Sequence, residues 1–229
     1  MRIAYERAFP LLDRRIAAGL KNRSVMELRI QGLSFLGWKG IDLNLAAGEI
    51  QCLLGDSGSG KSLLLRAIAD LIENEGQVEL DGRERETYSP QEWRRTVGFL
   101  PAEILWWERT VGEHFDKELP VDRLARLRLS EEAFAWEPSR LSMGERQRLG
   151  FARLLDREPS ILLLDEPTAN LDEEAASLVE TEIFEYIRHR EASALWVTHS
   201  LEQARRVASR VWRMKDQRLV PMEEEGGEL

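Results

Sequence analysis

The chain has 229 residues, of which 43% are hydrophobic and 32% charged, a composition that favours one folded domain and excludes a largely disordered protein. Its formal net charge of −9 argues against the basic face that binding to a phosphate backbone requires, so no nucleic-acid partner is expected. No stretch reaches the roughly 18–20 consecutive apolar residues of a membrane-spanning helix, and the N-terminus lacks the features of a signal peptide. We therefore expect the chain to stay in the cytoplasm.

Residues 1–25 differ in composition from the rest of the chain. Six basic and only two acidic side chains fall within the first 24 residues, and a strand-like run begins just after Met26. Two interpretations stay open for this N-terminal extension, a poorly ordered addition or a short helix that caps the domain. We expect the working domain to span 26–222 and the acidic tail 223–229 to be solvated.

Hydrophobic patterning predicts an α/β fold with a largely parallel sheet covered on both faces, because short apolar runs alternate with stretches of helical spacing. The aromatic-rich segment 103–140 contains no strand-like run, so we expect a helical subdomain of about 103–156 inserted into the core. The expected strands are 27–30, 41–45, 50–54, 77–80, 97–100, 161–164, 194–198 and 210–213, and the expected helices are 61–72, 144–156, 173–189 and 200–208.

The strand expected at 50–54 holds the only cysteine, Cys52, which we interpret as a buried thiol, and it ends in a glycine-rich loop. This loop has the spacing G-x-x-x-x-G-K-[ST] of a loop that binds nucleotide phosphates. Its glycines let successive N–H groups face phosphate oxygens. Lys61 is predicted to reach the β- and γ-phosphates, and Ser62 to bind Mg²⁺. The predicted nucleotide-binding residues are Gly55, Asp56, Ser57, Gly58, Ser59, Gly60, Lys61, Ser62 and Leu63.

Two carboxylates, Asp165 and Glu166, follow the strand expected at 161–164. The carboxyl end of a strand in an open α/β sheet is where ligands bind, so both side chains are expected at the mouth of the nucleotide site. We expect Asp165 to hold Mg²⁺, through a water, and Glu166 to act as the general base on the attacking water.

Further along, the chain resembles the ABC ATPase family in three more segments, which occur in the family's order. Residues 141–148 (LSMGERQR) are similar to the family's signature motif, residues 169–172 (ANLD) to its D-loop, and residues 196–199 (WVTH) to its switch histidine. The resemblance covers about 27–215. It implies a P-loop NTPase cassette with a small antiparallel N-terminal sheet beside the parallel core, and an ATPase that uses ATP and Mg²⁺.

The resemblance also implies that two cassettes work as a pair, so a homodimer is expected on ATP binding. In the family, the signature of one cassette closes over the ATP held by the loop of the other. By that analogy Ser142 and Gly144 contact the partner's γ-phosphate, Asp172 couples the two sites, and His199 contacts the γ-phosphate and helps orient the water. The expected catalytic residues are therefore Glu166, His199 and Lys61.

The match departs from the family pattern at three places. Ala102 stands where the family has a glutamine that approaches the metal, so either Glu103 or a water substitutes, or the metal loses a ligand and turnover slows. Met143 replaces a glycine in the signature, a change that we expect to be tolerated. The aromatic residue that stacks on adenine is either Trp38 or Phe35, between which the sequence does not choose.

We expect the chain to power a separate membrane permease on the cytoplasmic face of the inner membrane, in a small exporter-type system. The segment 103–107, with the adjacent Trp106 and Trp107, lies where the family meets its permease, so at least one tryptophan is a candidate partner anchor; the alternative is that both pack within the helical subdomain. Two other functions stay open, a non-transport ABC ATPase that acts on nucleic acid or ribosomes and a weakly hydrolytic ATP-binding regulator.

Overall fold

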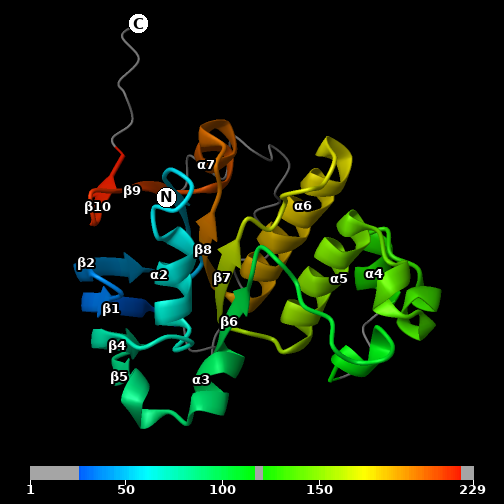
Figure 1. The fold of residues 1–229 in the computed structure, drawn as a ribbon, viewed down its shortest axis with the longest axis horizontal. Helices are drawn as coiled ribbons and strands as arrows, with labels where there is room; N and C mark the ends of the chain where they lie inside the picture. Colours follow the sequence, from blue (N-terminus) through cyan, green and yellow to red (C-terminus); the bar gives the residue numbers. More distant parts are fainter. Residues whose placement is uncertain (1–25, 117–120, 223–229) are drawn as a thin grey trace, which may run out of the picture.

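The computed structural model describes residues 26–116 and 121–222, which form two β-sheets with helices packed around them (Figure 1). The larger sheet has six strands in the order β10-β9-β3-β8-β7-β6. Its strands from β9 to β6 run parallel, and β10 pairs antiparallel with β9 at one edge. In spatial order these strands are Arg218–Pro221, Arg210–Lys215, Ile50–Leu54, Ser193–Val197, Ile161–Asp165 and Val97–Leu100.

The smaller sheet is antiparallel, in the order β2-β1-β4-β5. Buried and exposed residues alternate at the start of β1, as expected for a strand with one face on the core. Gly76 marks a close approach between β1 and β4, since a Cβ there would lie 2.6 Å from the carbonyl oxygen of Gly32. The strands are Trp38–Leu45, Leu28–Phe35, Glu75–Leu80 and Arg83–Glu84.

In the described part of the chain six α-helices surround the sheets, and several begin at a side chain that accepts a hydrogen bond from the first turn. Ser142 and Glu145 form a reciprocal capping box at the start of α5, and Asp172 and Ser200 cap α6 and α7, so these helix starts are fixed by sequence. Between β6 and β7 the described residues contain only helices, three of them short 3₁₀ turns. The α-helices are α2 Lys61–Ile68, α3 Pro90–Thr96, α4 Val121–Arg126, α5 Met143–Asp156, α6 Glu173–Arg190 and α7 Leu201–Val207.

The larger sheet separates two hydrophobic clusters. Because side chains alternate along a strand, Cys52 and Leu54 of β3 face one cluster and Leu53 faces the other. The first cluster joins the sheet to the helical part, α6 and α7, and the second joins it to α2, α3 and the smaller sheet. Burial on both faces explains why β3, β7 and β8 are continuous apolar runs rather than alternating ones.

The fold class predicted from the sequence is confirmed, including the parallel core, the helical part and the small antiparallel sheet. Cys52 is fully buried, as predicted, and burial raises the pKa of its thiol. Four elements were missed, the short strands β5 and β10, helix α3 and the 3₁₀ turn Arg85–Thr87. The helix expected to reach residue 72 ends at Ile68, and Asp70 follows with a φ of 57°. The extension 1–25 and tail 223–229 lie outside the described residues.

Among the described residues, no helix combines the length and apolar character needed to cross a lipid bilayer.

Candidate functional site

The glycine-rich loop forms a cavity at the carboxyl edge of the larger sheet, between the end of β3 and the start of α2. Its volume is about 180 Å³. Gly58 and Gly60 adopt φ values of 79° and 90°, a left-handed backbone that other residues rarely adopt. The cavity therefore depends on these two glycines. It is lined by Ser57, Gly58, Gly60, Lys61, Ser62, Leu63, Glu166 and His199, so residues from three separate segments meet here.

Lys61 begins α2 and lies almost fully inside the loop, with 5% of its surface exposed. Its Nζ donates hydrogen bonds to the carbonyl oxygens of Gly55 at 2.7 Å and Asp56 at 2.9 Å. Burial lowers the pKa of the Lys61 ammonium, and the nearby carboxylates of Glu166, Asp165 and Asp56 oppose that shift. The result is a cation held at the centre of the loop, where phosphate groups would be neutralised.

Asp165 is the last residue of β7, and only 2% of its surface is exposed. One carboxylate oxygen, Oδ1, is buried without a hydrogen-bond partner, which is an unusual cost for a charged group. Burial raises the pKa of Asp165, and a hydrogen bond from Ser62 opposes this. A free carboxylate oxygen beside a hydroxyl is the donor set that Mg²⁺ prefers, with further positions supplied by phosphates and water. These residues therefore fit a magnesium ion.

Glu166 follows Asp165 with a φ of 52°, a conformation that costs a non-glycine residue about 1–2 kcal/mol. Its N–H donates to the carbonyl oxygen of Val197 at the end of β8, so the turn after β7 is tied to the neighbouring strand. The Oε1 atom of Glu166 lies 2.5 Å from Nε2 of His199. The parallel pairing of β7 with β8 brings these two side chains together at the same sheet edge.

The two aromatic candidates for adenine stacking lie one behind the other. Phe35 and Trp38 stack with ring centroids 6.1 Å apart and an angle of 11° between the planes. Phe35 is buried in the core at 4% exposure, whereas Trp38 is half-buried and packs against the loop. A Cβ added to Gly60 would lie 2.8 Å from Nε1 of Trp38. Of the two rings, Trp38 is therefore the one beside the phosphate-binding loop.

The segments that resemble the signature and D-loop do not line this cavity. Ser142 and Met143 are exposed at the start of α5, and Asp172 is exposed at the start of α6, where its Oδ1 accepts a hydrogen bond from the first turn. The two segments are neighbours, since a Cβ at Gly144 would lie 3.4 Å from Leu171. Residues for which the sequence predicts phosphate contacts thus form two groups, one around the loop and one at the start of α5.

Gln147 lies within the signature-like segment, but no role is predicted for it from the sequence. Its side chain is buried at 5% exposure, and Nε2 donates to the carbonyl oxygens of Glu166 at 3.4 Å and Pro167 at 3.3 Å. Gln147 therefore links α5 to the turn that carries the carboxylates. A buried polar residue on an otherwise apolar helix face was the signal that could have identified it.

The segment after β6 presents an aromatic surface. Leu105 and Trp107 are 66% and 65% exposed, while Trp106 is half-buried against the helical part. The guanidinium of Arg153 lies over both tryptophan rings, 4.6 and 5.0 Å from their centroids. His114 is buried below them, where Nε2 accepts from the N–H groups of Trp107 and the next residue. This surface is fixed from behind, because His114 and Arg153 hold the rings.

Ala102, at the start of the same segment, is exposed and offers no polar side-chain atom. Glu103, the suggested substitute for the missing glutamine, is exposed as well and does not line the phosphate cavity.

Comparison with known proteins gives consistent matches. The family described as ABC transporter matches residues 38–169. The chain is 39% identical over 191 residues to the aliphatic sulfonates import ATP-binding protein SsuB 2 of Agrobacterium fabrum, covering 80% of this chain and 71% of that protein. It is 31% identical over 193 residues to the probable iron export ATP-binding protein FetA of Escherichia coli, covering 77% and 86% of the two chains.

Among solved structures, a dimeric ATP-binding cassette in a post-hydrolysis state bound to ADP and phosphate superimposes with a TM-score of 0.73. It covers 88% of this chain and 100% of the cassette, at 24% sequence identity. At that identity the structural likeness establishes the fold alone. Membership of the family rests on the family match and on the two sequence relatives.

Proposed function

The chain belongs to the ABC transporter family of ATP-binding subunits, and we propose that its ATP hydrolysis powers a membrane permease carried on a separate chain. As a member of this family it is an ATPase. The observation that supports the site assignment is that Lys61, Glu166 and His199 line one cavity and that Asp165 is hydrogen-bonded to Ser62 of the same lining. These residue types at one sheet edge are what hydrolysis of a phosphoanhydride needs, namely a cation for the phosphates and a base for the water.

In the proposed mechanism, the loop N–H groups and Lys61 bind the phosphates, and Trp38 stacks on adenine. Ser62 and Asp165 hold Mg²⁺, which supplies positive charge to the phosphate oxygens. Glu166 accepts the proton of the attacking water. His199, within contact distance of Glu166, positions that water and the γ-phosphate.

We propose that a second copy of the chain completes the site. Ser142 and Gly144 lie outside the cavity at the exposed start of α5, so their predicted phosphate contacts require ATP bound to another cassette. The N-terminus of α5 would then point its free N–H groups at that phosphate. The dimeric solved relative supports this arrangement.

The proposed permease contact is the surface formed by Leu105 and Trp107. Beside it is a groove lined partly by Arg94, Arg153 and Arg157, and exposed aromatic side chains next to arginines are typical of interaction anchors. The proposed location is thus the cytoplasmic face of the inner membrane.

The test of the permease proposal is co-purification of the tagged chain from detergent-solubilised membranes of its source cells. A stoichiometric polytopic membrane protein is the expected partner. Trp107→Ala should reduce its recovery while ATP binding stays intact, and Val220→Ala, which shortens another exposed apolar side chain, should leave recovery unchanged. Recovery of ribosomes or soluble proteins alone would contradict the proposal.

For the direction of transport we propose export, in a small exporter-type system. The chain's overall length and compact helical segment support this. The sequence relatives include proteins named for import and for export, so the partner identified by co-purification decides between them.

One observation favours a second function. Ala102 offers no ligand where the family has a glutamine, which is consistent with a weakly hydrolytic ATP-binding regulator. A MgATPase rate that Glu166→Gln abolishes would dismiss this alternative.

A further inference from the structure

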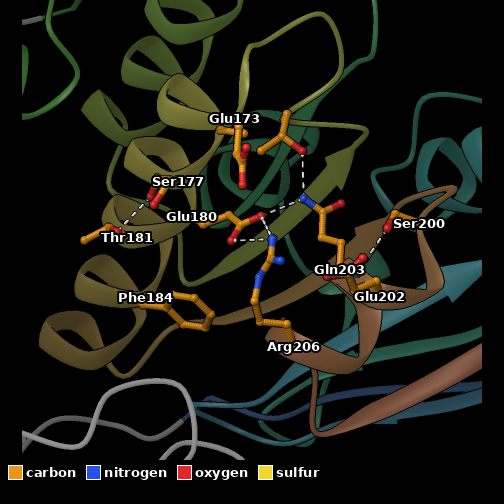
Figure 2. Close-up of a pocket in the computed structure, with 11 residues that line it drawn as sticks. Glu173, Ser177, Glu180, Thr181, Phe184, Ser200, Glu202, Gln203 and Arg206 are labelled. Carbon is orange, nitrogen blue, oxygen red and sulfur yellow. Dashed lines mark hydrogen bonds and ion pairs between the residues drawn. The ribbon is translucent and has the colours of Figure 1, made fainter.

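Gln203 of α7 joins the two segments that carry the proposed catalytic pair, Glu166 and His199. Its Oε1 accepts a hydrogen bond of 2.6 Å from the hydroxyl of Thr198, the residue before His199. Its Nε2 donates to the hydroxyl of Thr168 at 2.9 Å, two residues after Glu166. One amide therefore bridges the turns that follow β7 and β8. Gln203 lines the cleft of about 750 Å³ between α6 and α7 (Figure 2).

The orientation of this amide is determined by Glu180 of α6. Gln203 Nε2 also donates to Glu180 Oε1 at 2.7 Å, and a carboxylate can only accept. The amide nitrogen must therefore face α6, which leaves its oxygen for Thr198. Glu180 itself is buried at 7% exposure and receives Arg206 Nη2 on both oxygens, at 2.8 and 3.0 Å. The bridge thus rests on a paired, buried carboxylate rather than on a mobile side chain.

The turn that carries His199 is closed on itself as well. Thr198 is 5% exposed, and its hydroxyl accepts from the N–H of Ser200 while donating to Gln203. The hydroxyl of Ser200 accepts in turn from the N–H of Gln203. His199 itself projects from this turn with half of its side chain exposed, toward Glu166. Because solvent surrounds much of the ring, few neighbouring side chains hold it. The position of His199 is therefore set by the turn and the bridge.

We propose that Gln203 is a positioning residue for ATP hydrolysis, which holds the turn carrying His199 in register with Glu166. The inference rests on the catalytic roles proposed above for this pair. Gln203 does not line the phosphate cavity, so it acts on the geometry of the pair and not on the nucleotide. Loss of the bridge therefore lowers kcat and leaves KM for MgATP unchanged, since small misplacements of reacting groups are costly to turnover.

The test uses the full chain with steady-state phosphate release. Gln203→Met keeps the side-chain length and removes all three hydrogen bonds, and kcat should fall about ten- to a hundredfold with KM within about twofold of wild type. Glu202→Gln, on the exposed neighbour in the same helix, is the matched control and should leave both constants unchanged.

A swap of the two partners distinguishes positioning from general packing. Gln203→Glu places two carboxylates together and should lower kcat at least as much as Gln203→Met, because like charges repel. Combining it with Glu180→Gln restores one carboxylate and one amide, and kcat should return to within about threefold of wild type, since contacting residues couple. A swap variant no more active than Gln203→Glu overturns the proposal.

Two other results would also overturn it. One is a wild-type kcat in Gln203→Met, and the other is a loss of MgATP binding in proportion to the loss of kcat. Glu166→Gln measured alongside separates this inference from the assignment on which it rests. If Glu166→Gln keeps wild-type turnover, the catalytic pair itself is misassigned. If Glu166→Gln loses turnover and Gln203→Met keeps it, the pair stands and the bridge is dispensable.

Discussion

Replacement of Glu166 by glutamine tests the proposed chemistry most directly, because the two side chains have the same shape. Glutamine can keep the contact with His199 that Glu166 Oε1 makes at 2.5 Å, and it preserves the lining of the phosphate cavity. It cannot accept a proton from water at neutral pH. A general base contributes about 10²–10⁴-fold to a rate, or about 3–5.5 kcal/mol of barrier, so kcat should fall by that factor.

The assay is phosphate release at saturating MgATP, with the Kd for MgATP measured in parallel. The Kd should not rise, because the variant removes a negative charge beside the triphosphate. With hydrolysis blocked, the ATP-bound dimer should accumulate and appear in light scattering. Glu84→Gln, on an exposed strand of the smaller sheet, is the control for loss of a carboxylate. A kcat within about threefold of wild type would be too small a loss for the removal of a general base. Either that result or a protein that stays monomeric under MgATP would refute the reasoning.

Three further outcomes follow from the same structure. Trp38→Ala should weaken ATP binding about tenfold, since stacking of a base on an aromatic ring contributes about 1–3 kcal/mol. Phe35→Leu should instead lower the free energy of unfolding and leave the Kd for ATP unchanged. Calorimetry measures ATP binding by both variants. Asp165→Asn should weaken binding of MgATP by about tenfold or more but not of ATP in EDTA, as fluorescence titration would show. Burial holds the pKa of Cys52 far above its ordinary value in the folded chain. Above about pH 8.5 the thiol therefore loses its proton in the unfolded chain but keeps it in the folded one. The free energy of unfolding should then fall by about 1.4 kcal/mol per pH unit. Cys52→Ala should remove that part of the slope in urea unfolding between pH 8 and pH 10, and an identical slope in both proteins would be the contrary result.

Elements with strong periodicity could be predicted from the sequence, and short ones could not. The buried strands β3, β7 and β8 are continuous apolar runs next to turn signals, which is why their positions agree with expectation to within a residue or two. Helix α3 is seven residues long, and it buries Trp93 alone, so it carries no repeating apolar pattern to detect. Strands β5 and β10 are short and exposed, and they are fixed by pairing with a neighbour.

The site shows a similar division. Residues next to the phosphates could be identified because loop spacing and strand ends dictate their chemistry, as with Lys61 and Asp165. The sequence could not choose between Phe35 and Trp38, since both lie near the same turn and only tertiary packing places Trp38 against Gly60. Gln203 was missed because two of its three side-chain partners are 35 and 23 residues away in the chain, and no local pattern marks such a bridge.

The contact of Gln147 with the turn after β7 has a consequence for how the ATP sites of two copies of the chain would be coupled. The start of α5 is the part predicted to contact the partner's nucleotide, and four residues later the same helix is tied to the backbone of Glu166. If ATP bound to the partner shifted the start of α5, this hydrogen bond would pass the shift on to the base that serves the other ATP. ATP turnover by the pair should accordingly be cooperative, with a sigmoidal dependence on ATP concentration that becomes hyperbolic when Gln147→Leu removes the link.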